Sequence, residues 1–389
     1  MSTPVEKTGR FGDDVAFMKK HTDVIVLAGA DGQAQVAVAP ELQGRVMTST
    51  AAGPEGLSFG WINHDLFQSG KRDPHINVFG GEDRFWMGPE GGQFSIFFKK
   101  GVPFDFEHWF TPACIDTEPF ETVRASKDAA IFRRKIRIES YAGFAFELEV
   151  TREIRLLAPA AIWKALGVAA PAGAKAVAFE TENTLANAGA ATWTKETGLL
   201  SIWILGMFNP SPATTVVVPY NSGPEAGLGP IVNDAYFGKV PADRLVVGKN
   251  VLYFRADGKH RSKIGLTPKR CMSVCGSYDA QNRVLTVVQF NKPGGAAEYV
   301  NSMWELQKEP FAGDTVNSYN DGPVSPGAKP LGPFYELETS SPAAALKPGG
   351  TITHVHRTIH LQGDDKTLDP VARTVLGVSL DEIRGAFKK

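Results

Sequence analysis

The densest group of residues that could do chemistry lies between positions 73 and 94, in the stretch DPHINVFGGEDRFWMGPEGGQF. Two pairs of adjacent glycines there bracket Glu82, Asp83, Arg84, Trp86 and Glu90. Glycine lets the backbone turn sharply and lets a ligand approach closely. The spacing is not that of a phosphate-binding or dinucleotide-binding loop. An indole for stacking, with an arginine and carboxylates to bind hydroxyls, favours a sugar ligand. The alternative is a structural loop in which Arg84 pairs internally with Glu82 or Asp83.

A second group lies on two predicted strands in the stretch 334–360, FYELETSSPAAALKPGGTITHVHRTIH. Glu336 and Glu338 share one face of the first strand. Three histidines share one face of the second strand: His354, His356 and His360. If these faces converge, repulsion between the carboxylates raises their pKa values and favours a general base near neutral pH. Histidine and glutamate are also ordinary zinc ligands, so a metal site is a second interpretation. The third interpretation is a solvated outward face.

Three other segments, GWINHD, FEHWF and NSYNDG, place aromatic or turn residues beside hydrogen-bonding groups. They add Trp61, His108, Asn320 and Asp321 as candidate sugar-binding residues. Each also has a structural interpretation, because large β cores use tryptophan and turns use Asn and Asp without any ligand. Lys263 could meet an anionic group, but we expect it to be solvated.

The elements that must position these residues are mainly strands. Forty glycines and 26 prolines interrupt segments whose hydrophobic residues recur with a period of two. The predicted strands are 23–27, 35–39, 94–99, 131–139, 144–156, 199–205, 214–219, 250–255, 283–290, 334–339 and 351–361. Strands this numerous predict an all-β protein, a large antiparallel β-sandwich, with residues 1–389 as a single domain.

Helical signals lie mainly near the two ends, around residues 13–21 and 370–387. Asp13 is predicted to cap the first helix. Asp369, followed by Pro370, opens a second helix, and Ser379 with Glu382 forms a capping box for a third. The stretch 158–170 is helix-like but contains proline and glycine, so its structure stays open.

Composition excludes several classes of function. The 389 residues carry 41 Lys plus Arg and 42 Asp plus Glu, a net charge of −1, which gives no general reason to bind nucleic acid or an anionic membrane. No apolar run approaches the roughly 20 residues of a membrane span. Residues 1–10 lack the apolar region of a secretory signal, so the chain is expected to be cytoplasmic, or exported if a leader was removed. The three cysteines are expected to be buried small hydrophobes, and nothing in the sequence requires a cofactor.

Together, several segments resemble the galactose mutarotase-like supersandwich proteins, and more closely an uncharacterised branch with the same GGEDRFW-GPEGG loop. Residues 44–49, GRVMTS, resemble the opening strand of aldose epimerases. Residues 79–86 resemble the loop whose arginine binds sugar hydroxyls and is followed by an aromatic, which Arg84 and Trp86 match. Glu338, in LET followed by Pro342 and LKPG, matches the epimerase base.

This resemblance implies a carbohydrate-active enzyme of the kind that isomerises an aldose, with Glu338 as base, Arg84 holding a hydroxyl and Trp86 stacking on the sugar. The epimerase histidines are missing, because their matched places hold Phe79 and Gly80, and the run 206–209, GMFN. His75 is the expected replacement for the general acid. Lyase or hydrolase action on a polysaccharide, and sugar binding without catalysis, are the alternatives.

Overall fold

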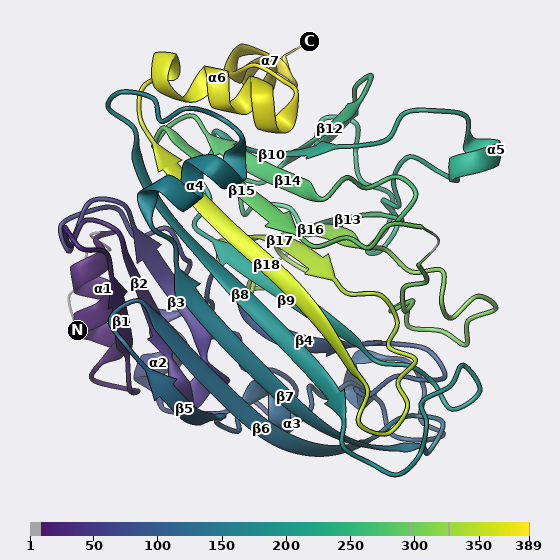
Figure 1. Cartoon of the computed structure of the whole chain (residues 1–389). Helices are drawn as coiled ribbons and strands as arrows, with labels where there is room; N and C mark the ends of the chain where they lie inside the picture. Colours follow the sequence, from purple (N-terminus) through teal and green to yellow (C-terminus); the bar gives the residue numbers. More distant parts are fainter. Residues whose placement is uncertain (1–8, 296, 326, 389) are drawn as a thin grey trace.

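The computed structural model describes residues 9–295, 297–325 and 327–388, and most of its strands form two large antiparallel sheets (Figure 1). The ten-stranded sheet has the order β11-β12-β10-β14-β15-β18-β8-β7-β6-β5. Its strands are β5 Glu121–Ala125, β6 Ala129–Glu139, β7 Ala145–Leu156, β8 Lys175–Asn187, β10 Thr214–Pro219, β11 Leu245–Val247, β12 Val251–Arg255, β14 Val274–Asp279, β15 Val284–Phe290 and β18 Thr351–Gln362. The five-stranded sheet has the order β13-β16-β17-β9-β4. Its strands are β4 Arg84–Gly88, β9 Ser201–Phe208, β13 Ser262–Leu266, β16 Val316–Asn320 and β17 Tyr335–Ser340.

The two sheets pack face to face because each strand turns every second side chain toward the other sheet. Buried residues of both sheets form common hydrophobic clusters, in which Phe85 and Ile204 join Phe132 and Phe179. Nearer β10, Leu337 of the smaller sheet packs in a cluster with Val216 and Val288 of the larger one. The large antiparallel β-sandwich expected from the sequence is therefore confirmed.

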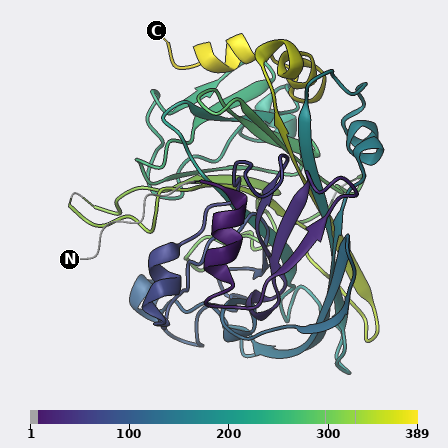
Figure 2. The same cartoon turned by 90° about the vertical axis from the view of Figure 1, so that its left-hand side faces the viewer.

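Helices cover the outside, and a third sheet shares the core of the two large sheets, because its Leu27, Val36 and Val46 pack in the cluster that contains Phe85 and Phe132. The third sheet has β1 Ile25–Ala28, β2 Gln35–Ala39 and β3 Arg45–Thr50, and α1 Phe11–Met18 packs on it. The helix α2, His64–Ser69, lies beside α1, where Phe17 contacts His64 and Phe67 (Figure 2). The helices α4 Pro159–Leu166, α6 Asp365–Leu376 and α7 Leu380–Gly385 pack on the outer side of the ten-stranded sheet (Figure 1). The short elements α3 Ala113–Asp116, α5 Glu225–Leu228, η1 Pro40–Leu42 and η2 Phe106–His108 lie in connections. None of the helices described has both the length and the apolar character of a membrane span.

Most predicted strands are present within a few residues of the expected bounds, and the capping box of Ser379 and Glu382 is confirmed. The strand expected at 94–99 is wrong. There the backbone bonds to separate loops, Ile96 to Pro89 and Phe110 to Phe97, and so joins no ladder. The cap expected at Asp13 is also wrong, because α1 begins at Phe11 and has Arg10 at its N-cap.

The first of the two C-terminal helices begins earlier than expected. Asp364 caps α6, and Pro370 lies inside that helix rather than at its first turn. The stretch 158–170, whose structure the sequence does not decide, contains the helix α4. This helix ends at Gly167, which has a left-handed backbone conformation. Of the three cysteines, Cys271 and Cys275 are buried as expected, whereas Cys114 is only partly buried.

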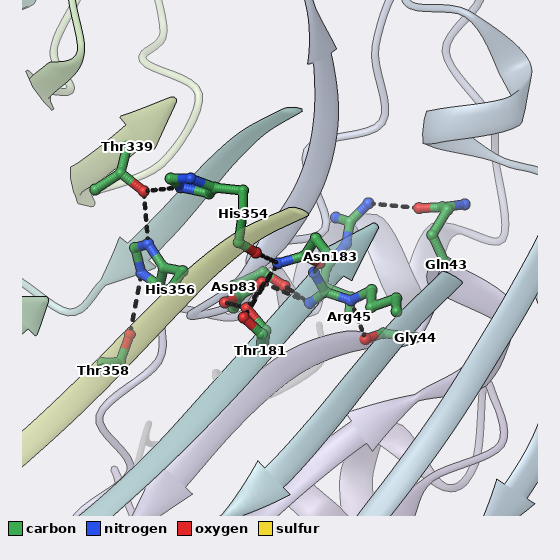
Figure 3. Close-up of polar contacts among 11 residues, drawn as sticks. Gln43, Gly44, Arg45, Asp83, Thr181, Asn183, Thr339, His354, His356 and Thr358 are labelled. Carbon is green, nitrogen blue, oxygen red and sulfur yellow. Dashed lines mark hydrogen bonds and ion pairs between the residues drawn. The ribbon is translucent and has the colours of Figure 1, made fainter. Parts of the chain in front are cut away.

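A buried polar layer lies between the two large sheets (Figure 3). Arg152 pairs with Asp83 and donates to Asn183 Oδ1 at 2.7 Å, while Thr181 donates to Asp83 at 2.8 Å. In the same layer, the Thr339 hydroxyl lies 2.7 Å from His354 Nε2 and 2.8 Å from His356 Nδ1. These imidazoles are therefore held by a neutral hydroxyl in the interior of the sandwich.

The expected convergence of the histidines with Glu336 and Glu338 is wrong. Strand β18 pairs with β15 and β8, not with β17. Because side chains alternate along β17, Thr339 turns toward the histidines and Glu338 turns the opposite way. Within the described ranges, no group of three His, Cys, Asp or Glu side chains is arranged to hold a metal ion.

The buried histidines predict a loss of stability in mild acid. Burial lowers the pKa of His354 to about 3 and that of His356 to about 4, against an ordinary value of 6.5. Below pH 6.5 the unfolded chain therefore binds protons that the folded chain excludes. Between pH 6.5 and 5, we expect each histidine to remove about 2 kcal/mol of unfolding free energy.

Urea unfolding of the wild type and of the double variant His354→Gln, His356→Gln measures this effect. The double variant should be less stable at pH 7 but show a weaker pH dependence, and the exposed His21→Gln serves as control. Equal pH slopes for the double variant and the wild type would contradict the assignment.

Candidate functional site

The outer face of the five-stranded sheet, meaning the face turned away from the ten-stranded sheet, gathers the charged residues singled out in the sequence. Arg84 on β4 pairs in register with Leu205 on β9, which pairs with Glu338 on β17. In the next row, Trp86 is opposite Trp203. The row on the other side holds Glu336, Tyr319 and Lys263. Residues more than 250 positions apart thus share one face.

Glu338 is fully buried, and its two oxygens have different surroundings. Oε2 accepts hydrogen bonds from the Trp203 indole at 3.0 Å and from the Lys263 ammonium at 2.9 Å. Among the described residues, none donates to Oε1. A buried acceptor without a donor is costly, so this oxygen is suited to receive a proton or a hydroxyl from a ligand.

Arg84 also has hydrogen-bond donors that no described residue accepts from. Its Nη2 lies 3.5 Å from Glu336 Oε1, and its guanidinium carbon lies 4.2 Å from the centre of the Trp86 ring. Its Nε and Nη1, and the Trp86 indole nitrogen, are buried without a hydrogen-bond partner in the described part of the chain. Arg84 and Trp86 therefore offer donors on the same sheet face as the free oxygen of Glu338.

The charged residues on this face shift one another's pKa values. Burial, and then repulsion by Glu338, raises the pKa of Glu336 to about 8, although Arg84 and Lys263 act in the opposite direction. Burial acts to lower the pKa of Lys263, but Glu338, Glu90 and Glu336 outweigh it and raise that pKa above its usual range. Burial also raises the pKa of Glu90. Near neutral pH these shifts favour the protonated form of Glu336 and the charged form of Lys263.

Aromatic rings border these charged residues. Trp86 contacts Trp203 edge to face at 5.5 Å between ring centres, and it contacts Phe97 at 5.1 Å. Trp109 stacks on Phe97 at 5.8 Å and on Trp304 at 5.7 Å. These rings come from three different loops and two strands, and they shield the site from water.

The glycines of the first segment serve the chain itself rather than a ligand. Gly80 has a φ of +91°, and a Cβ there would lie 2.0 Å from the Trp61 carbonyl oxygen. A Cβ at Gly91 would lie 2.4 Å from the Met303 carbonyl oxygen. Only glycine permits these approaches, which fix the loop that carries Glu90 against the segment that carries Trp304.

Glu82 and Asp83, which precede Arg84 in the sequence, do not form ion pairs with it. Glu82 accepts from Ser49 at 2.9 Å and lies 2.8 Å from His360, and Asp83 pairs with Arg152. The alternative that Arg84 pairs with Glu82 or Asp83 is therefore wrong, since its partner is Glu336. Glu82 is not brought to the outer face, because the groups it bonds lie between the sheets.

Other predicted site residues lie around the outer face or away from it. Asp321 accepts from the Tyr319 hydroxyl at 3.0 Å, and Trp61 packs on Phe334 at 4.8 Å in a cluster with Tyr319. Asn320 is the last residue of β16, and its side-chain amide is occupied, because it accepts from the Gly258 amide and donates to the His260 carbonyl.

The two candidate histidines stay apart from the carboxylates. His75 is 2.6 Å from the Trp109 carbonyl and stacks between Phe106 and Phe110. His108 is 2.6 Å from Asp105. Within the described ranges, no hydrogen bond or ion pair joins either histidine to Arg84, Glu336 or Glu338.

Sequence reasoning missed two residues that contact Glu338. Lys263, expected to be solvated, is largely buried, and its ammonium lies 4.9 Å from the centre of the Trp203 ring. Trp203 lies in the predicted strand 199–205, but it is not among the candidate site residues named from the sequence. The usable signal was strand position, since both residues lie in strands between buried neighbours.

A cavity of about 930 Å³ lies elsewhere, between α1, α2 and the ends of both sheets. Phe17, Phe59, Phe208 and His360 are among its lining residues. None of the residues that contact Glu338 lines it. It is therefore separate from the candidate site.

Comparison with solved structures places this architecture among galactose mutarotase-like proteins. A putative aldose 1-epimerase from Escherichia coli K12 matches with a TM-score of 0.51 and 13% identity, over 87% of this chain and 98% of the other. A putative mutarotase from Salmonella typhimurium matches with a TM-score of 0.51 and 11% identity, over 89% of this chain and 92% of the other. At these identities the likeness shows the fold.

A family model described as a family of unknown function, DUF6786, matches residues 9–387. The chain therefore belongs to this family, which has the galactose mutarotase-like fold. No curated protein sequence matches the chain.

The buried ion pair between Lys263 and Glu338 predicts that removing the lysine strongly lowers the stability of the fold. Lys263→Met leaves the fully buried Glu338 without its cation, and removing one partner of a buried pair costs about 3–5 kcal/mol. The matched control is Lys239→Met, because Lys239 pairs with Asp234 at 2.7 Å but its side chain is 80% exposed. Exposed pairs contribute about 0–1 kcal/mol. Urea unfolding at pH 7 measures both, and similar losses in the two variants would contradict a structural role for the buried pair.

Proposed function

We propose that the outer face of the five-stranded sheet binds a sugar and that Glu338 acts on it as a general base. The observation that carries the proposal is the unpartnered Glu338 Oε1, which is buried on the same sheet face as the unpartnered nitrogens of Arg84 and the Trp86 indole. One acceptor, several donors and an aromatic wall match the hydroxyls and the apolar ring face of a sugar. Two structurally similar proteins are described as a putative aldose 1-epimerase and a putative mutarotase, which agrees with this proposal.

In anomer interconversion, the base removes the proton of the anomeric hydroxyl, whose electrons form a carbonyl. The bond from the anomeric carbon to the ring oxygen breaks, and that oxygen takes a proton from an acid. Ring closure on the other carbonyl face reverses both transfers. Glu338 suits the base role, because Lys263 and Trp203 hold one oxygen and leave the other for the substrate.

We assign the acid role to Glu336 in place of His75. The imidazole of His75 is stacked between two phenylalanines and bonded to a backbone carbonyl. Glu336 shares the face of Glu338, contacts Arg84, and has its pKa raised to about 8 by burial and by Glu338. At neutral pH it is a carboxylic acid with a proton to give, while its neighbour accepts one.

Replacing the base tests the proposal directly. Glu338→Gln removes the proton acceptor and keeps the side-chain shape, so anomer interconversion should slow by about 10²–10⁴-fold. Polarimetry or NMR on a panel of aldoses measures the rate. Glu55→Gln is the control, because Glu55 is 81% exposed and pairs only with Arg10 at the surface.

Equal rates for Glu338→Gln and the wild type would remove Glu338 as base. A sugar that raises the melting temperature without any turnover would support the non-catalytic alternative, which the missing histidines favour. A new ultraviolet absorbance with uronate polymers would instead support a lyase.

The acid assignment predicts the pH dependence. An acid with a pKa of about 8 is protonated below that pH, so activity should fall as pH rises through 8. Glu336→Gln should be slower by about 10²-fold or more and should lose this alkaline limb. Initial rates between pH 5 and 10 measure both effects. An unchanged alkaline limb in Glu336→Gln would exclude Glu336, and loss of the limb in His75→Gln would restore His75.

A further inference from the structure

We propose that Phe106 and Phe237 are stacking subsites for sugar units on the two sides of the site, so that the ligand is an oligosaccharide chain. This inference rests on the proposed sugar-binding function and extends it to the length of the ligand. In the described part of the chain, the exposed phenylalanines are Phe106, Phe110 and Phe237. All of them lie on loops whose neighbouring residues border the outer face.

Phe106 stands on the side of β4. Its ring is 60% exposed, although it stacks on His75 at 4.8 Å and on Trp109 at 6.0 Å. The ring contacts continue from Trp109 to Phe97 and from Phe97 to Trp86, which lies on β4 with Arg84. The stacked partners hold the Phe106 ring in place, so a ligand that stacks on it orders little additional protein.

Phe237 stands on the other side of the site. Its ring is 45% exposed and contacts Tyr319 on β16 edge to face at 5.9 Å. The guanidinium of Arg261 lies 3.8 Å from the centre of the Phe237 ring, and its Nε is buried without a hydrogen-bond partner in the described ranges. This side therefore offers a fixed ring together with an unused donor.

The separation of the two strands to which the ring contacts lead favours a chain over a single sugar. Strands β4 and β16 are separated by β9 and β17, which makes three strand spacings, or about 14 Å. Glu336 and Glu338 lie between them on β17. A ligand that reaches both rings must extend beyond one sugar ring in both directions from the carboxylates.

The chemistry between the rings favours a glycan over a protein partner. Phe106 and Phe237 do not form one apolar patch, because their ring contacts lead to β4 and to β16, which lie on different sides of the five-stranded sheet. Asp105 and Glu107 flank Phe106 in the sequence and are exposed. Isolated rings among hydrogen-bonding groups suit the alternating apolar and hydroxyl faces of a polysaccharide.

The experiment is calorimetric titration with neutral cello-, xylo-, malto- and chito-oligosaccharides of one to six units. For the series that binds, affinity should rise at least tenfold from one unit to four. Phe106→Ala and Phe237→Ala should each lower tetrasaccharide affinity about tenfold more than monosaccharide affinity, and Phe106→Trp and Phe237→Trp should restore it. Val123→Ala is the control, because Val123 is 48% exposed on the edge strand β5.

The outcomes separate this inference from the proposed function. If single sugars bind and affinity does not change with length, the subsites are refuted while the sugar site stands. Equal losses for single sugars and oligosaccharides in both alanine variants would also refute the subsites. If no sugar of any length binds or is turned over, the proposed function fails and this inference fails with it.

Discussion

The ion pair between Glu338 and Lys263 is the interaction on which the candidate site depends. Glu338 is fully buried, and a buried carboxylate without a cation and hydrogen bonds is strongly disfavoured. The lysine comes from β13, at the edge of the five-stranded sheet, and the carboxylate comes from its central strand. Their bond therefore connects the middle of the sheet to its edge, and it fixes which carboxylate oxygen stays available.

The two faces of this sheet bury polar groups for different purposes. Between the sheets, Asp83, Arg152 and Asn183 bond to one another, and this network is largely complete within the chain. On the outer face, Arg84 and Glu338 retain unpartnered atoms. Structural networks satisfy their own members, whereas a binding site leaves groups for its ligand. Asp83 belongs to the structural network and its neighbour Arg84 to the candidate site, because the two side chains point to opposite faces of the sheet.

The sequence predicted the sandwich and the meeting of Arg84 with the late glutamates, for separate reasons. Periodicity two predicted strands, and the family resemblance matched Arg84 and Glu338 to one site. The pairing partners of each strand could not be predicted, because period two specifies a face but not a neighbour. That limit explains the wrong convergence of His354 and His356 with Glu338. It also explains why Lys263, whose charge suggested solvent, was not recognised as buried.

The proposed replacement of a histidine acid by Glu336 changes the charge balance during the reaction. An imidazolium that gives up its proton becomes neutral, whereas a carboxylic acid becomes an anion. That anion would form beside Glu338, whose negative charge already opposes it, so the transfer needs a compensating cation close by. Arg84 lies 3.5 Å from Glu336 Oε1, and Lys263 acts on the same carboxyl. As Glu338 takes a proton, its own charge disappears when that of Glu336 appears. The total charge of the pair stays constant, so the two cations can stabilise the site before and after the transfer without rearranging.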